Sequence, residues 1–213
     1  MPAQKSPSAN RRRPRASTEK AAVFLNIPYD SQFENLLLAY IAGISAFGFA
    51  PRATLEIPFS ERRLERIIAL IGSSQYSVHD LSRVQLDRTS PSTPRFNMPF
   101  ELGLTVGLGN VKHPWIVCET VRRRVNKSLS DIDGTDVDIH GGTVRGVFRE
   151  LCNAFVRNRR QPSVVQMMQI YRILRSNFAS ILRKAGARDP FNARVFLDLC
   201  VLASAAADKL VLP

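Results

Sequence analysis

The chain has 213 residues, 45% of them hydrophobic, which suits one globular domain with an appendage and excludes a wholly disordered protein. The longest uncharged run, residues 35–51, is shorter than the roughly 20 apolar residues of a membrane-spanning helix, and three scattered cysteines make no disulfide framework. The first twenty residues lack the apolar stretch of a signal peptide, so we expect a cytoplasmic protein that does not bind a membrane.

Positive charge is concentrated at the start of the chain. The net charge is +12, and residues 1–20 hold six Lys or Arg side chains against Glu19 alone. Because this segment has almost no apolar surface, we expect it to be a disordered basic arm. Such an arm can bind nucleic acid or an acidic partner, or it can be a solvated tail, and the sequence leaves both open.

Apolar runs and helical patterns alternate from residue 22 onwards. The predicted strands are residues 22–27, 52–57, 76–81 and 115–118, with a shorter one near 137–139. The predicted helices begin near residues 33, 60, 99 and 143. Strands that alternate with helices in this way are typical of a doubly wound parallel sheet with helices on both faces, so we expect residues 21–160 to form an α/β domain.

Two features of this region add to the prediction. Residues 82–97 contain prolines and show no apolar periodicity, which indicates an exposed loop. Gly103 and Gly107 lie four residues apart on the helix that follows. We expect these glycines to let that helix approach the sheet closely.

The last fifty residues have a helical pattern. Apolar residues recur at helical spacing up to Gly186, which fits the left-handed end of a helix. Asp189 and Pro190 then predict the start of a final helix that runs to about residue 210. Residues 195–207 are apolar nearly all round, as in a helix that is sandwiched or buried between subunits. We expect residues 161–213 to be a helical appendage that packs on the sheet or joins two chains in a homo-oligomer.

Polar side chains gather where ligands bind in open parallel sheets, beyond the carboxyl ends of the strands. The candidates are Asn26, Tyr29 and Asp30 after the first strand, His79, Asp80 and Ser82 after the third, and Asn97, Met98 and Glu101 at the next helix start. A carboxylate in the first turn of a helix feels the positive end of the dipole, so we expect Glu101 to stay ionised. It could then stabilise or attack an oxocarbenium-like centre at a ribose C1′. The alternatives are that Glu101 caps its helix and that Asp80 caps a turn.

The same segments resemble known families. Residues 23–30, Val-Phe-Leu-Asn-Ile-Pro-Tyr-Asp, resemble the first box of TIR domains. Residues 76–82 and 97–104 resemble the signature of nucleoside 2-deoxyribosyltransferases and their TIR-like relatives, in which Asn-x-x-x-Glu-Leu-Gly opens a helix. The resemblance spans residues 22–158. It implies a flavodoxin-like, TIR-like sheet and attack on the N-glycosidic bonds of NAD or nucleosides, which in many bacterial members serves anti-phage defence.

Residue roles follow from the resemblance by position. It implies that Glu101 is the catalytic carboxylate and that Asp80 orients the ribose. It also implies that Tyr29 and Asn97 line the same pocket.

Two other motifs in the chain point elsewhere. Residues 131–135 match a phosphatase signature, and the four carboxylates within residues 131–138 suggest calcium, but the flanking residues that each site needs are missing. The three histidines have no zinc-like spacing. We therefore expect no metal and no resident cofactor.

These observations lead to two main hypotheses about function. The first is an enzyme that cleaves the N-glycosidic bond of NAD or a related nucleotide or nucleoside, as an NAD(P)+ nucleosidase or a deoxyribosyltransferase-like hydrolase. The second is a non-catalytic module that binds a nucleotide signal and signals through its C-terminal helices. A nucleic-acid-binding protein that uses the arginine clusters is a third, although no motif for it is present.

Overall fold

The computed structural model describes residues 20–57, 62–84, 90, 93–108, 114–122, 124–132, 134–156 and 161–211. The predicted basic arm therefore lies outside the described residues, apart from Lys20. The Lys20 ammonium donates to Ser204 Oγ at 2.7 Å and to Asp208 Oδ1 at 2.8 Å. Lys20 is thus fastened to the last helix and is part of the folded protein. The predicted helix start near residue 60 also lies outside the described residues.

A five-stranded parallel sheet forms the centre of the protein. Its strands are β1 (Ala22–Asn26), β2 (Ala50–Ala53), β3 (Tyr76–Asp80), β4 (Trp115–Glu119) and β5 (Val137–Ile139). They lie in the order β2-β1-β3-β4-β5, which confirms the predicted flavodoxin-like α/β fold. Asn26 pairs in register with His79, and Asp80 with Cys118, so the polar ends of the strands meet at one edge.

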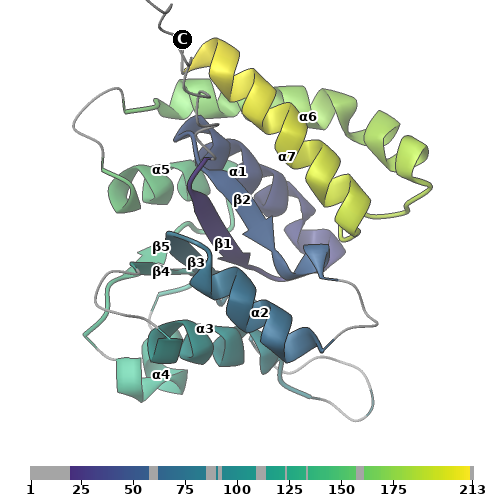
Figure 1. The fold of residues 1–213 in the computed structure, drawn as a ribbon. Helices are drawn as coiled ribbons and strands as arrows, with labels where there is room; N and C mark the ends of the chain where they lie inside the picture. Colours follow the sequence, from purple (N-terminus) through teal and green to yellow (C-terminus); the bar gives the residue numbers. More distant parts are fainter. Residues whose placement is uncertain are drawn as a thin grey trace, which may run out of the picture.

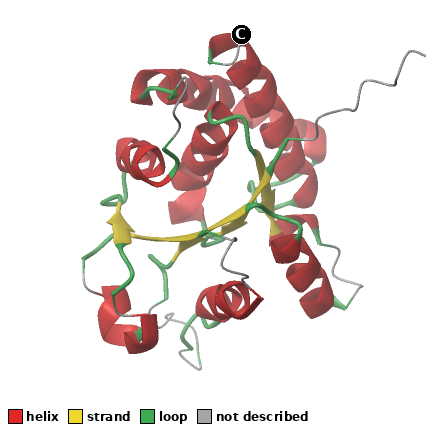
Figure 2. Ribbon diagram, turned by 60° about the vertical axis from the view of Figure 1, so that its left-hand side comes forward, coloured by secondary structure: helices red, strands yellow, loops and turns green. Residues whose placement is uncertain are grey.

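Helices cover both faces of this sheet (Figures 1 and 2). One face carries α1 (Glu34–Ala46) and α5 (Val144–Ala154), and the other carries α2 (Arg63–Gly72), α3 (Asn97–Leu108) and the short α4 (Arg124–Ser128). Alternate side chains of β1 serve the two faces: Val23 and Leu25 pack with α1, whereas Phe24 packs with α2. This two-sided burial explains the unbroken apolar run of β1.

The C-terminal helices α6 (Val164–Ala185) and α7 (Ala193–Leu210) form a further layer outside α1 (Figure 1). Every residue from Leu36 to Ala46 of α1 is buried, because α1 lies between the sheet and this outer pair. The appendage therefore packs mainly on α1, and it also contacts the sheet at β2, where Cys200 of α7 lies against the Pro51 carbonyl. The apolar circumference of α7 is thus explained largely within one chain.

The structure corrects two predicted boundaries and adds one helix. The predicted strand 52–57 is β2 followed by a 3₁₀ turn, Thr54–Glu56, because the Glu56 carboxylate folds back to accept from Ala53 N at 2.9 Å and Arg52 Nε at 2.8 Å. The cap of α7 is Asn192, whose side chain accepts from Arg194 N; Asp189 instead accepts from Phe191 N. The short helix α4 was not predicted.

The glycines of α3 do not face the sheet. Gly103 and Gly107 are exposed, and a Cβ atom built on either would meet no atom within 4 Å. The buried side of α3 is formed instead by Met98, Glu101, Leu102 and Thr105. The predicted close approach through these glycines is therefore wrong.

Among the described helices, none combines the length and apolarity that crossing a membrane requires.

Candidate functional site

A cavity of about 390 Å³ lies beyond the carboxyl end of β1. Its wall is made by residues 26–29, Thr54, Arg63, residues 93–98 and Glu101. The chain leaves β1 toward the face that carries α1 and leaves β3 toward the face that carries α3, so the cavity lies at the topological switch point of the sheet. Five of the nine predicted site residues, Asn26, Tyr29, Asn97, Met98 and Glu101, line it.

Asn26 holds the base of this pocket together. Its side-chain amide donates to the Met98 carbonyl at 2.8 Å and to His79 Nδ1 at 2.9 Å, and both Asn26 and His79 are buried. Because His79 Nδ1 accepts, the neutral imidazole carries its proton on Nε2. His79 is thus placed behind Asn26, outside the pocket wall, where it orients the amide.

Glu101 is the buried carboxyl group of the pocket, with 7% of its surface exposed. Burial raises its pKa from 4.5 to about 7, and the attraction of Arg63 opposes this rise only in part. Glu101 is the fifth residue of α3 and not a first-turn residue, so desolvation outweighs the helix dipole. The expectation that Glu101 simply stays ionised was wrong: near neutral pH it titrates, as catalytic carboxyl groups often do.

Tyr29 is part of the pocket wall. Its hydroxyl lies 2.9 Å from Thr54 Oγ1, and its ring centroid is 5.7 Å from that of Phe191, in the segment between α6 and α7. Burial raises the pKa of Tyr29 well above its usual range, with a further contribution from Glu101. Tyr29 therefore stays protonated and can donate or accept a hydrogen bond without carrying charge.

Asp30 lies beside the pocket and binds two arginines of the segment between β3 and α3. One of its carboxylate oxygens receives Arg83 Nε at 3.2 Å and Arg95 Nη1 at 2.9 Å. The other accepts from Gln32 N at 3.1 Å and so caps the 3₁₀ turn Ser31–Phe33. Asp30 thus ties the β1–α1 connection to the segment that contains residues 93–98.

Asp80 is not brought to this pocket. Its carboxylate is fully buried and accepts from Tyr40 Oη at 2.8 Å, from His140 Nε2 at 2.9 Å and from Ser82 N at 2.9 Å. These bonds join α1, β3 and the segment after β5. The turn-capping alternative for Asp80 matches these contacts.

Ser82, His140 and Asp80 lie together without forming a catalytic triad. His140 Nδ1 accepts from Gly142 N at 3.0 Å, so its proton is on Nε2, which faces both Asp80 and, at 3.2 Å, Ser82 Oγ. In a triad the acid and the nucleophile use opposite ring nitrogens. Here they share one, so His140 cannot pass a proton from Ser82 toward a substrate in that manner.

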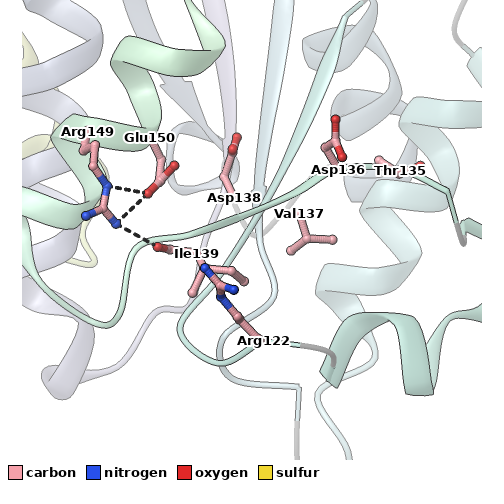
Figure 3. A pocket seen from close by; sticks show the side chains of 8 residues that line it. All are labelled: Arg122, Thr135, Asp136, Val137, Asp138, Ile139, Arg149 and Glu150. Carbon is pink, nitrogen blue, oxygen red and sulfur yellow. Dashed lines mark hydrogen bonds and ion pairs between the residues drawn. The ribbon is translucent and has the colours of Figure 1, made fainter.

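A second cavity, of about 560 Å³, lies along the edge strand β5 (Figure 3). Burial and the repulsion of Glu150 and Asp136 raise the pKa of Asp138 there to about 6. Arg149 donates to Glu150 and to the Ile139 carbonyl, and Arg122 also lines the cavity, near Ile139. Its acidic groups are thus offset by arginines. It lies apart from the switch point, and within the described ranges no group of His, Cys, Asp and Glu could hold a metal ion.

Sequence reasoning missed several side chains of the Glu101 pocket, among them Thr54, Arg63 and Arg95. Thr54 follows β2, Arg63 begins α2, and Arg95 comes from the loop before α3. Only the position of Thr54 after a strand carried a signal, and the predicted strand boundary at residue 57 concealed it. No apolar periodicity marks either Arg63, at the start of α2, or Arg95 as a pocket residue.

Comparisons with known proteins yield no relative. The chain matches no protein-family model, and no significant match is found among curated proteins or solved structures.

Proposed function

We propose that the protein hydrolyses the N-glycosidic bond of NAD or a related nucleotide or nucleoside, with Glu101 as the catalytic carboxylate. The observation that carries the proposal is the buried Glu101 carboxyl group at the switch-point pocket, with Asn26, Tyr29 and Asn97 around it. A buried carboxylate has little water around it, so its attraction to a nearby positive charge is only weakly screened. Such a group is therefore suited to a site where positive charge develops during the reaction.

The chemistry needs few groups. As the C1′–N bond breaks, its electron pair leaves with the base and positive charge spreads over C1′ and the ring oxygen. Ionised Glu101 stabilises that charge, and a water oxygen then bonds to C1′ and releases its proton to solvent. Tyr29 and Asn97 supply uncharged hydrogen-bonding groups for the ribose hydroxyls, since the pKa of Tyr29 is raised by burial.

A second candidate function is a nucleotide sensor that reports through its C-terminal helices. The contact of Tyr29 with Phe191 favours it, because this contact links the pocket wall to the segment between α6 and α7. A ligand that moves Tyr29 would therefore act directly on the outer helical layer. The proposed function also includes homo-oligomerisation, a cytoplasmic location and a role in anti-phage defence.

The test is release of free base from NAD and from a panel of nucleosides and nucleotides, followed by liquid chromatography. We expect Glu101→Gln to lower turnover by at least about 100-fold while the variant still binds ligand, because the amide keeps the volume and removes the charge. Glu65→Gln is the matched control, since Glu65 is an exposed helical carboxylate paired with Arg62. Full turnover in a folded Glu101→Gln variant would reject the enzyme. Tight nucleotide binding without base release by the wild type would favour the sensor.

A further inference from the structure

Guanidinium groups outnumber carboxylates around the Glu101 pocket. Arg63 and Arg95 both line it, and Arg83 stands beside Arg95 on the single carboxylate of Asp30. Among the described residues at the pocket, Asp30 and Glu101 supply the carboxyl groups. Glu101 is partly protonated near neutral pH because burial raises its pKa. The pocket therefore carries excess positive charge and attracts anions.

The two lining arginines are accessible. Arg63 is exposed at the first residue of α2, and the Arg95 side chain keeps 37% of its surface exposed while one of its nitrogens is on Asp30. A guanidinium has five donors in a planar fork, so an arginine that is bonded on one side can still receive an oxyanion on another. Phosphate is the anion that matches this fork best.

The cavity that these arginines share with Glu101 limits the size and kind of ligand that can bind. They share one cavity of about 390 Å³ with the carboxyl group, a volume typical of small-molecule sites. The ring of Phe96 lies on the same wall with 64% of its surface exposed, where it offers a face on which a base can stack.

We propose that Arg63 and Arg95 form an anion subsite of the Glu101 pocket, so that its ligand is a phosphate-bearing nucleotide and not a free nucleoside. This inference deepens the proposed function and rests on it for the identity of the sugar. Glu101 then faces C1′, and the arginines hold the phosphate on the far side of the ribose.

The experiment measures binding to the full chain by titration calorimetry, with D-ribose 5-phosphate and D-ribose as probes, and with adenosine 5′-monophosphate and adenosine as a second pair. We expect each phosphorylated probe to bind at least about tenfold more tightly than its partner, since charge-assisted hydrogen bonds to phosphate are worth that or more. Arg63→Met and Arg95→Met should each reduce this ratio by about five- to tenfold. Arg66→Met is the matched control, because it removes the same charge from α2 outside the pocket wall.

The outcomes separate the two proposals. Equal binding of phosphorylated and unphosphorylated probes, or a phosphate preference that both arginine variants keep, would overturn the subsite. If free nucleosides are cleaved in a Glu101-dependent way without such a preference, the glycosidase stands and the subsite falls. If phosphate binding depends on Arg63 and Arg95 but no base is released from any nucleotide, the subsite stands and the glycosidase falls. Arg63 is exposed on α2, so the Arg63→Met test does not depend on how Arg95→Met affects the segment that contains Arg95.

Discussion

The side-chain amide of Asn26 donates a hydrogen bond of 2.8 Å to the main-chain carbonyl of Met98, which fastens the end of β1 to the first turn of α3. Met98 lies about one helical turn before Glu101. The bond therefore fixes the turn that presents the Glu101 carboxyl group, and it does so from the strand at the centre of the switch point. A sheet-anchored carboxyl group is held more firmly than one on a free loop.

The first prediction concerns the pH dependence of activity. Because burial raises the pKa of Glu101 to about 7, the ionised form that the proposed reaction needs becomes populated only as the pH rises through that value. We expect kcat/KM for base release to rise with pH to a plateau above about pH 8. Glu101→Gln should lose the rising limb together with the activity. Activity that falls through pH 7 would show that the protonated form acts, as a general acid.

The same pKa predicts a change in stability. The folded state binds more protons than the unfolded state between pH 4.5 and about 7, so ionisation of Glu101 lowers the free energy of unfolding as the pH rises through this window. The difference corresponds to about 3 kcal/mol at most. Glu101→Gln should thus be more stable than the wild type at pH 8 and similar to it at pH 4, as measured by urea unfolding. Equal stability at pH 8 would contradict the raised pKa.

The second prediction concerns the network around Asp80. Asp80→Asn turns a group that accepts three hydrogen bonds into one that must place an amide donor against another donor. We expect a loss of roughly 2–4 kcal/mol in the free energy of unfolding, and a smaller loss for Tyr40→Phe. Nucleotide affinity of the folded fraction should be nearly unchanged. A variant with full stability and weakened ligand binding would instead support the ribose-orienting role.

The sequence predicted the sheet well because parallel strands buried on both faces appear as unbroken apolar runs, as at residues 22–27. It could not predict what covers α7. An apolar circumference shows only that most of a helix is covered, and the structure shows that α6 and α1 of the same chain cover α7. The polar residues that follow a strand correctly indicated Asn26 and Tyr29 as pocket residues. The same pattern misplaced Asp80, because a carboxylate at a strand end can point into the interior. There it accepts hydrogen bonds from Tyr40 and His140.

The third prediction compares two helical glycines. A Cβ atom at Gly146 would lie 1.9 Å from the His140 carbonyl oxygen, whereas at Gly103 it would meet nothing within 4 Å. Gly146→Ala must displace the main chain at the start of α5, so we expect a loss of about 3 kcal/mol or more. Gly103→Ala should raise the free energy of unfolding by up to about 1 kcal/mol through helix propensity alone. Thermal unfolding of both variants tests this, and a destabilised Gly103→Ala would mean that its face is occupied.

The last prediction concerns assembly through α7. Leu199 is fully buried against the core, so Leu199→Asp should unfold the protein at a cost above about 4 kcal/mol, whatever the oligomeric state. Val201 keeps 70% of its surface exposed on the same helix, and Leu197, one turn away, keeps 45%. We expect this exposed pair to join two chains, because exposed apolar side chains on one helical face are typical of subunit contacts. Val201→Asp should therefore yield monomers with an unchanged melting temperature, as measured by light scattering at micromolar concentration. A wild-type protein that is monomeric and fully active at that concentration would show that α7 serves only to cover α1.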